Sequence, residues 1–251
     1  MTIRGIKIPV FMSLIIWAIV WEFIGRTDAS FVIPPLSNVA QRIIEIAPTD
    51  TFINALAITG KSYFLGMGIS ILFGVPLGIV MGRSDVVDKL FLPWVNIFVS
   101  APLTALVPVI MVLFGFGEQT IVLTVVLFAI WIIVLNARAG VREISRSLVE
   151  MAHCFGATPL QSFFKIYIWA ALPEILGGIR LGFIRGVKGV IIGQLLVSII
   201  GFGQLFELYS SRFLMEHFWA LNFMILAFVF TLNEGLVWLQ NKVSYYASTR
   251  D

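Results

Sequence analysis

The side chains that most often catalyse reactions or bind metals are scarce in this sequence and lie far apart. The chain has two histidines, His153 and His217, and a single cysteine, Cys154. Metal sites and nucleophilic catalysis both need several such groups that converge on one point. One cysteine excludes an internal disulfide, and Cys154 is interpreted as a small apolar side chain and not as a reactive thiol. We therefore expect no metal site, no catalytic centre and no cofactor bound by this chain.

The run Thr59-Gly60-Lys61-Ser62 imitates the end of a nucleotide-binding P-loop. That loop requires a glycine five residues before the second one and a strand in front of it. Ala55 occupies the position of the first glycine, and no strand pattern precedes it. The sequence thus predicts no ATP site here, and Lys61 is expected to extend toward the membrane surface.

The stretch from Glu150 to Pro173 predicts two short helices outside the membrane. Gly156 suits the left-handed residue that ends a helix. Thr158 and Gln161 have the spacing of a capping box, with Pro159 at the first helical position, where its missing N–H costs nothing. Pro173 is expected to end or bend the second helix, or to open the next one.

The first of these helices carries two stripes. The apolar stripe has i, i+3, i+4 and i+7 spacing and consists of Leu148, Met151, Ala152 and Phe155. The basic stripe has i, i+4 and i+8 spacing and consists of Arg138, Arg142 and Arg146. An apolar ridge in an aqueous loop needs a cover. Either it packs on the chain's own membrane helices, or it docks in the groove of a soluble partner.

The composition is that of an integral membrane protein. Hydrophobic residues make up 59% of the chain, charged residues 12%, and the mean hydropathy is +0.97, whereas soluble domains have roughly 25% charged residues. The net charge of +3 is scattered around apolar segments and does not indicate nucleic-acid binding. We expect one all-α membrane domain over residues 1–251.

Six apolar segments are long enough to span a bilayer: residues 8–24, 57–82, 90–114, 120–136, 176–200 and 218–239. The first resembles a signal peptide but is expected to be retained, because it lacks a clear cleavage site and has the bulky Trp17 and Trp21 late in the run. Residues 27–50 form an outer connector in which Ser37 is expected to cap a short surface helix, and Glu22 is expected to pair with Arg26.

The basic residues define the orientation of the six spans. One side holds Arg4, Lys7, Arg83, Lys89, Arg138, Arg142, Arg146, Lys165, Lys242 and Arg250. The other holds Arg26, Arg42 and Arg212, with Lys61 at its edge. Because cytoplasmic loops carry the excess of positive charge, both termini and the loop at about residues 138–173 are expected in the cytoplasm.

Three features point to a path through the membrane. Pro93, Pro102 and Pro108 interrupt one segment, which suggests a distorted helix lining a path; a kinked packing helix is the alternative. Small residues form one face of the second span (Ser70, Gly74, Gly78, Gly82) and one of the fifth (Gly178, Gly182, Gly186, Gly189, Gly193), and these faces are expected to pack on each other or across two copies. Lys188, near mid-membrane, must face a partner, a cavity or the bundle interior.

The pattern E-x-A-x-x-x-G, with a later aliphatic residue and proline, resembles the EAA loop of ABC importer permeases. It is matched by Glu150, Ala152, Gly156, Ile166 and Pro173. Other runs resemble the nitrate/sulfonate/taurine branch: IPPLSNV, PLGIVMGRS, APLTALVPVIMVLFGFG, ALPEILGGIRLGFIRGVKGVIIGQLL and GFGQL. The resemblance extends from about residue 33 to 240. The chain departs from many members at Trp169, where they have proline, and at Gln194, where they have glutamate.

The resemblance implies the six-helix type I importer fold in a bacterial-type cytoplasmic membrane. It implies a second copy of the permease, a cytoplasmic ABC ATPase dimer that uses ATP and Mg, an external solute-binding protein, and membrane lipid as partners. The residues implied to contact the ATPase are Glu150, Met151, Ala152, His153, Cys154, Phe155, Gly156 and Ala157. Glu150 either braces the loop through Arg142 or Arg146 or is a solvated charge.

The candidates for the translocation path are Lys188, Arg185, Gln194, Pro102 and Pro108. The unpaired cation of Lys188 favours a small polar or anionic solute, as does the resemblance to nitrate, sulfonate and taurine permeases. Another small organic solute is the alternative within the superfamily. A membrane-embedded enzyme is disfavoured because it needs clustered His, Asp, Glu or Cys side chains; a channel or transporter independent of ATP is the third possibility.

Overall fold

The structure, a computed structural model, describes residues 2–3, 6–7, 10–27, 31–197 and 200–248. Two short strands, β1 (Thr2–Ile3) and β2 (Ile6–Lys7), pair antiparallel. Arg4, Arg250, residues 8–9 and residues 198–199, which the expected spans and charge count include, lie outside the described residues. The other described elements are helices, as predicted.

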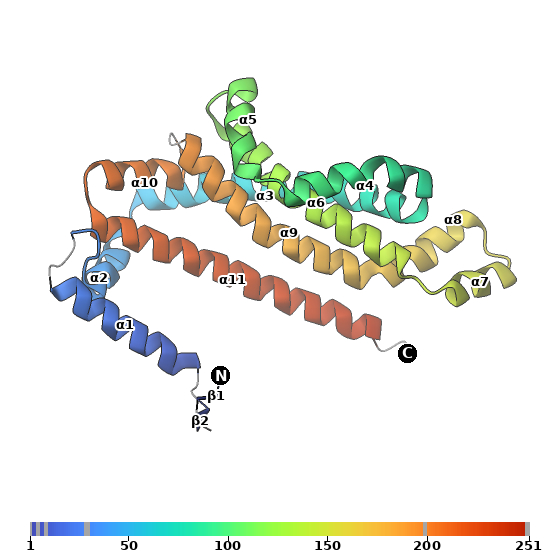
Figure 1. Cartoon of the computed structure of the whole chain (residues 1–251), viewed down its shortest axis with the longest axis horizontal. Coiled ribbons are helices and arrows are strands. Elements are labelled where there is room, and N and C mark those ends of the chain that lie inside the picture. Colours follow the sequence, from blue (N-terminus) through green and yellow to red (C-terminus); the bar gives the residue numbers. More distant parts are fainter. Residues whose placement is uncertain (1, 4–5, 8–9, 28–30, 198–199, 249–251) are drawn as a thin grey trace.

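The helices follow one another along the chain as Figure 1 shows. They are α1 (Val10–Arg26), α2 (Leu36–Ile46), α3 (Asp50–Arg83), α4 (Asp85–Ser100), the 3₁₀ turn η1 (Leu103–Leu106), α5 (Val107–Phe114), α6 (Glu118–Arg142), α7 (Arg146–Cys154), α8 (Pro159–Ser162), the π turn η2 (Phe163–Tyr167), α9 (Ile168–Val197), α10 (Phe202–Ser211) and α11 (Met215–Ser248). Several of these helices are longer than the apolar segments that suggested them. In particular, Arg138 and Arg142 belong to α6 and not to the loop that follows it.

Helix α6 lies between α3 and α9 and contacts both. One set of its side chains is completely buried between them: Ile121, Val125, Ala129, Ile133 and Ala137. Burying apolar surface in this way holds three helices together along one axis. This three-helix unit carries the other elements, and α4 and the α8–η2 segment lie toward the end of the molecule where α7 projects (Figure 1).

The small-residue faces of α3 and α9 both pack mainly on α6. A Cβ added at Gly78 would lie 2.5 Å from the carbonyl oxygen of Val134, and one at Gly182 would lie 2.7 Å from Cδ1 of Ile133. Gly186 is an exception, because its Cβ would meet a methionine side chain of α3. The prediction that both faces pack closely is therefore confirmed, but the expected partner, each other or a second copy, is wrong: both faces pack chiefly on α6, which lies between α3 and α9.

The expected third span is broken into two helices. The axes of α4 and of the η1–α5 segment differ by 99°. The break falls at Ala101, whose ψ of 150° is extended, as expected for the residue before a proline. Pro102 precedes η1, and Pro108 lies in the first turn of α5, where its missing N–H leaves no helical hydrogen bond unmade. The predicted distortion is confirmed at Pro102, whereas Pro93 lies inside the continuous helix α4.

The charged residues between the second and third apolar segments form no loop, since only Ser84 separates α3 from α4. The hydroxyl of Ser84 accepts a hydrogen bond from the N–H of Val87 at 3.5 Å. Asp85 and Asp88 both lie in the first turn of α4, where carboxylates interact favourably with the helix dipole. The capped and acidic first turn explains why α4 begins only one residue after α3 ends.

Within the described residues, three helical stretches are long and apolar enough to cross a membrane by themselves: α3, α6 and residues 215–235 of α11. Two bent pairs raise this number to five. They are α4 with residues 103–114, and residues 160–197 with α10, the latter bent by 51°. Helix α1, which corresponds to the first expected span, has 17 residues and is not among these stretches.

Polar contacts join the end of α1, helix α2 and the start of α11. Glu22 pairs with Arg26 at 2.6 Å, which confirms that prediction. Helix α2 begins at Leu36, so Ser37 does not cap it; the backbone N–H and the hydroxyl of Ser37 instead donate to Glu22 at 2.9 and 2.8 Å. In α2, Arg42 donates to Glu216 of α11 at 2.8 Å. These contacts hold α2 across the ends of α1 and α11.

Candidate functional site

Helix α7 ends in the left-handed stop that its sequence predicts. Gly156 has φ +74°. The N–H of Ala157 donates to the carbonyl of Ala152 at 3.0 Å, and that of Gly156 to the carbonyl of His153 at 2.9 Å. This pair of hydrogen bonds is a Schellman motif, which satisfies the last carbonyls of a helix. The chain reverses sharply after α7 as a result.

The next helix is capped as predicted. The N–H of Thr158 donates to Oε1 of Gln161 at 2.9 Å, and the N–H of Gln161 donates to the hydroxyl of Thr158 at 3.3 Å. This reciprocal pair is a capping box. Pro173 lies inside α9 and does not end a helix. The irregular backbone of this segment is the π turn η2, which precedes α9.

Large apolar side chains are exposed on both sides of the turn between α7 and α8. Phe155 is 85% exposed and Met151 49%, whereas Ala152 is buried beneath them. Leu160 and Phe164, on the other side of the turn, are also exposed. Their i, i+4 spacing was the available signal, but sequence reasoning did not include them in the ridge. We define the docking ridge as Met151, Phe155, Leu160 and Phe164.

The other residues predicted for the same loop lie next to the docking ridge along the chain. Glu150, His153 and Cys154 are exposed, and Ala157 is half-buried. Ion pairs within the described part of the chain do not include Glu150 or Arg146. The expected brace from Glu150 to an arginine is thus not formed, because Arg142 pairs elsewhere.

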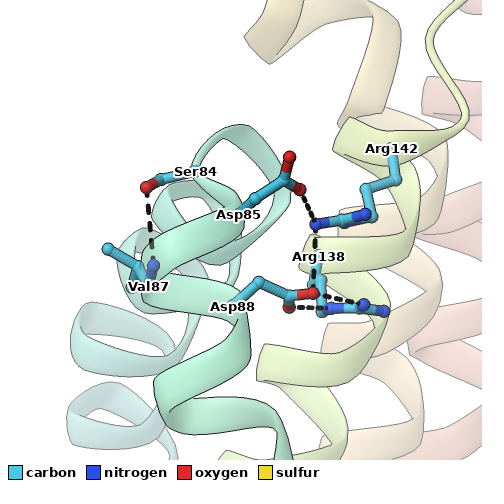
Figure 2. Close-up of polar contacts among 6 residues, drawn as sticks. All are labelled: Ser84, Asp85, Val87, Asp88, Arg138 and Arg142. Atoms are coloured by element: carbon cyan, nitrogen blue, oxygen red, sulfur yellow. Dashed lines mark hydrogen bonds and ion pairs between the residues drawn. The ribbon is translucent and has the colours of Figure 1, made fainter.

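Two arginines of α6 bind two aspartates of α4 (Figure 2). Arg138 donates from Nε and Nη2 to the two carboxylate oxygens of Asp88, the second at 2.7 Å. Nη2 of Arg142 lies 2.7 Å from Asp85 and 3.0 Å from Asp88. Asp88 is only 5% exposed. The sequence analysis identified the arginine stripe but not its acidic partners. The i, i+3 spacing of the two aspartates after Ser84 could have indicated that they share one helix face.

A cavity of about 320 Å³ separates these helices from α7. Its lining includes Arg83, Arg142, Arg146, Glu150 and Tyr167. The guanidinium of Arg83 lies 5.4 Å from the ring centre of Tyr167 and 5.6 Å from that of Phe163 in η2, within the range of a cation–π contact. The cavity allows α7 to stand away from the bundle while a short link ties it to α6.

The path candidates lie on α9 and on the bent α4–η1–α5 segment. Lys188 is exposed on the single chain and Arg185 is half-buried; no ion pair found among the described residues includes either. Pro102 and Pro108 are exposed. Helix α5 contacts α9, so the two segments adjoin, and an exposed cation lies on one of them. Lys61, by contrast, pairs with Glu118 at 3.0 Å.

Gln194 differs from the other path candidates because it is enclosed. Its Nε2 donates to the hydroxyl of Thr59 at 2.9 Å, and its Oε1 accepts the N–H of Phe202 at 3.2 Å. The residue is 1% exposed. In this chain its amide joins α3, α9 and the start of α10, and its side chain does not reach an open surface.

Comparison with known proteins agrees with this architecture. The family described as "Binding-protein-dependent transport system inner membrane component" matches residues 74–245. The taurine transport system permease protein TauC of Escherichia coli K12 is 28% identical over 84% of this chain and 79% of its own length. The formylaminopyrimidine transport permease protein ThiX of Halalkalibacterium halodurans is 27% identical over 82% and 79%.

A solved structure shows the same fold. The chain aligns with an inward-facing conformation of the MetNI methionine ABC transporter with a TM-score of 0.59 and 21% identity, over 78% of this chain and 94% of that one. The family match covers more than half of the chain, including α6, the α7–α8 turn and α9. The chain therefore belongs to the family of binding-protein-dependent transport system inner membrane components, and is a multi-pass ABC importer permease, a transport component and not itself an enzyme.

Proposed function

We propose that the chain forms the translocation path of an ATP-driven importer and that its docking ridge seats on a cytoplasmic ATPase. The observation that carries this proposal is Phe155, a large apolar side chain 85% exposed at a rigidly capped turn. Apolar groups presented on a short helix suit a groove in a partner. The turn projects beyond the end of the three-helix unit, where a soluble partner can reach it (Figure 1).

The proposed assembly has two copies of this permease, an ATPase dimer and an external solute-binding protein. The ATPases bind ATP and Mg, and their closure moves the α7–α8 turn. Each permease has six spans, with both termini and the turn in the cytoplasm. The excess of basic residues on that side supports this orientation.

The proposed solute is small and polar or anionic, of the nitrate, sulfonate or taurine type. The exposed cation of Lys188 on α9 supports it, and so does the similarity to a taurine permease. The similarity to ThiX and to glycine betaine permeases keeps another small organic solute as the alternative.

The test is co-purification and uptake with the matched variants Phe155→Asp and Phe116→Asp. Phe116 is also an exposed phenylalanine, in the turn between α5 and α6, so it controls for the added charge. We expect Phe155→Asp to lose the ATPase subunit and ATP-dependent uptake, and Phe116→Asp to keep the subunit. Normal ATPase binding by Phe155→Asp would refute docking through this ridge.

The same assay separates the other function classes. Uptake into vesicles without ATP hydrolysis would indicate an ATP-independent transporter. Chemical conversion of a solute by the purified chain would indicate a membrane-embedded enzyme.

A further inference from the structure

Asp88 lies where α4 meets α6. Helix α6 leads to the α7–α8 turn, and α4 leads to the η1–α5 segment. Its carboxylate accepts two hydrogen bonds from Arg138 and lies 3.0 Å from Nη2 of Arg142 (Figure 2). Arg142 is the last residue of α6, and only three residues separate it from Arg146, the first residue of α7. Since so short a link spans at most about 14 Å from Arg142 to Arg146, a displacement of α7 must pull on this end of α6.

Apart from the pair of Arg142 with Asp85, whose side chain is 82% exposed, the contact described between α4 and α6 is apolar. Val95 and Val134 are buried in one cluster, and the rings of Phe98 and Trp131 stack with their centres 4.3 Å apart. Apolar contact is non-directional, so it permits one helix to slide or rotate on the other. A bidentate arginine–carboxylate pair fixes both distance and orientation. The register of α4 on α6 therefore depends on Asp88.

Helix α3 also contacts α4, because only Ser84 separates the two helices and Met81 is buried in one cluster with Val95, but this contact is apolar. Helix α3 meets α6 through close backbone approach, where a Cβ at Gly82 would lie 2.9 Å from the carbonyl oxygen of Arg138. That contact fixes α3 on α6 but does not reach the body of α4. Beyond Ala101 the chain turns by 99° into the η1–α5 segment, whose Val112 is 85% exposed.

We propose that Asp88, held by Arg138 and Arg142, is the positioning residue that transmits displacement of α7 to α4 and thence to the η1–α5 segment. Its role presupposes the ATPase-coupled function proposed above. When the α7–α8 turn moves, α6 pulls on Asp88 through Arg138 and Arg142, and α4 moves together with α6. Without the carboxylate, α6 still moves but α4 slips along its apolar contacts.

The experiment measures uptake and ATP hydrolysis separately in proteoliposomes that contain the complete complex, with the solute that the wild type imports. The variants are Asp88→Asn, which removes the charge at constant size, and Arg138→Lys, which keeps the charge but loses the two-pronged contact. The control is Asp50→Asn, the same exchange in the first turn of α3 at an exposed position.

We expect both Asp88→Asn and Arg138→Lys to keep the ATPase subunit bound and to keep hydrolysing ATP. The uptake per ATP hydrolysed falls by about tenfold, within the range typical of coupling between distant sites. Asp50→Asn keeps the wild-type ratio. A purely structural role for Asp88 would lower the yield or thermal stability of the complex without changing this ratio.

A wild-type ratio in Asp88→Asn overturns the proposal. If that variant does not accumulate, Arg138→Lys decides in the same way. A wild-type complex that neither binds an ATPase nor imports with ATP overturns the proposed function instead, and that outcome is visible before any variant is compared.

Discussion

Gln194 and Thr59 are 135 positions apart in the chain, yet their side chains meet at 2.9 Å inside the bundle. The same amide accepts the N–H of Phe202, so one side chain joins α3, α9 and α10. Gly201 makes room for this side chain, since a Cβ there would lie 2.3 Å from Nε2 of Gln194, and a Cβ at Gly203 would collide with the backbone carbonyl of Gln194. The corner between α9 and α10 is thus built around a neutral amide.

Replacing Gln194 by leucine should destabilise this corner. The N–H of Phe202 would be buried without an acceptor, which costs about 1–3 kcal/mol. We expect a lower midpoint of thermal unfolding in detergent for Gln194→Leu. Gln194→Glu keeps an oxygen for Phe202 and should lose less. A leucine variant as stable as the wild type would contradict this account.

The substitution Gly156→Val should uncouple the complex. A left-handed conformation costs a residue with a Cβ about 1–2 kcal/mol, and the Schellman turn that orients the docking ridge would relax. We expect reduced ATPase co-purification and reduced uptake. Gly68→Val adds the same side chain where nothing lies within 4 Å and serves as the control. Wild-type transport by Gly156→Val at normal expression would show that the turn geometry is dispensable.

The two glycine faces should differ in their tolerance of bulk. At Gly78 the obstacle is backbone of α6, which cannot yield without separating the helices, whereas at Gly182 it is the flexible end of Ile133. Overpacking typically costs about 1–3 kcal/mol, so Gly78→Leu should lower the yield of folded protein more than Gly182→Leu. Gly60→Leu, with free space around it, controls for the mutation itself. Equal yields for all three would mean that α3 and α6 are not in close contact.

Lys188→Met should abolish uptake of a small anionic solute while leaving assembly and ATPase binding intact. An exposed cation on α9 attracts an anion electrostatically, and methionine keeps much of the bulk without the charge. The measurement compares uptake with ATPase co-purification in the same preparation. Unchanged uptake would place Lys188 away from the path.

The sequence alone determined the helix stop and the helix cap of the α7–α8 turn. Gly156, Thr158 and Gln161 act through hydrogen bonds between residues that are three to five positions apart, so their spacing already states the geometry. The break at Ala101 follows in the same way from the proline after it. The apolar segments and the family resemblance likewise needed no structure.

Only the tertiary structure decided which distant residues meet. Asp88 and Arg138 are separated by 50 positions, and the glycine faces of α3 and α9 show that a close partner exists without identifying it as α6. Gln194 was taken for a path residue because its polarity is visible in the sequence and its enclosure is not. These contacts depend on how the helices are arranged around α6, and helical periodicity shows which residues share a face but not what covers that face.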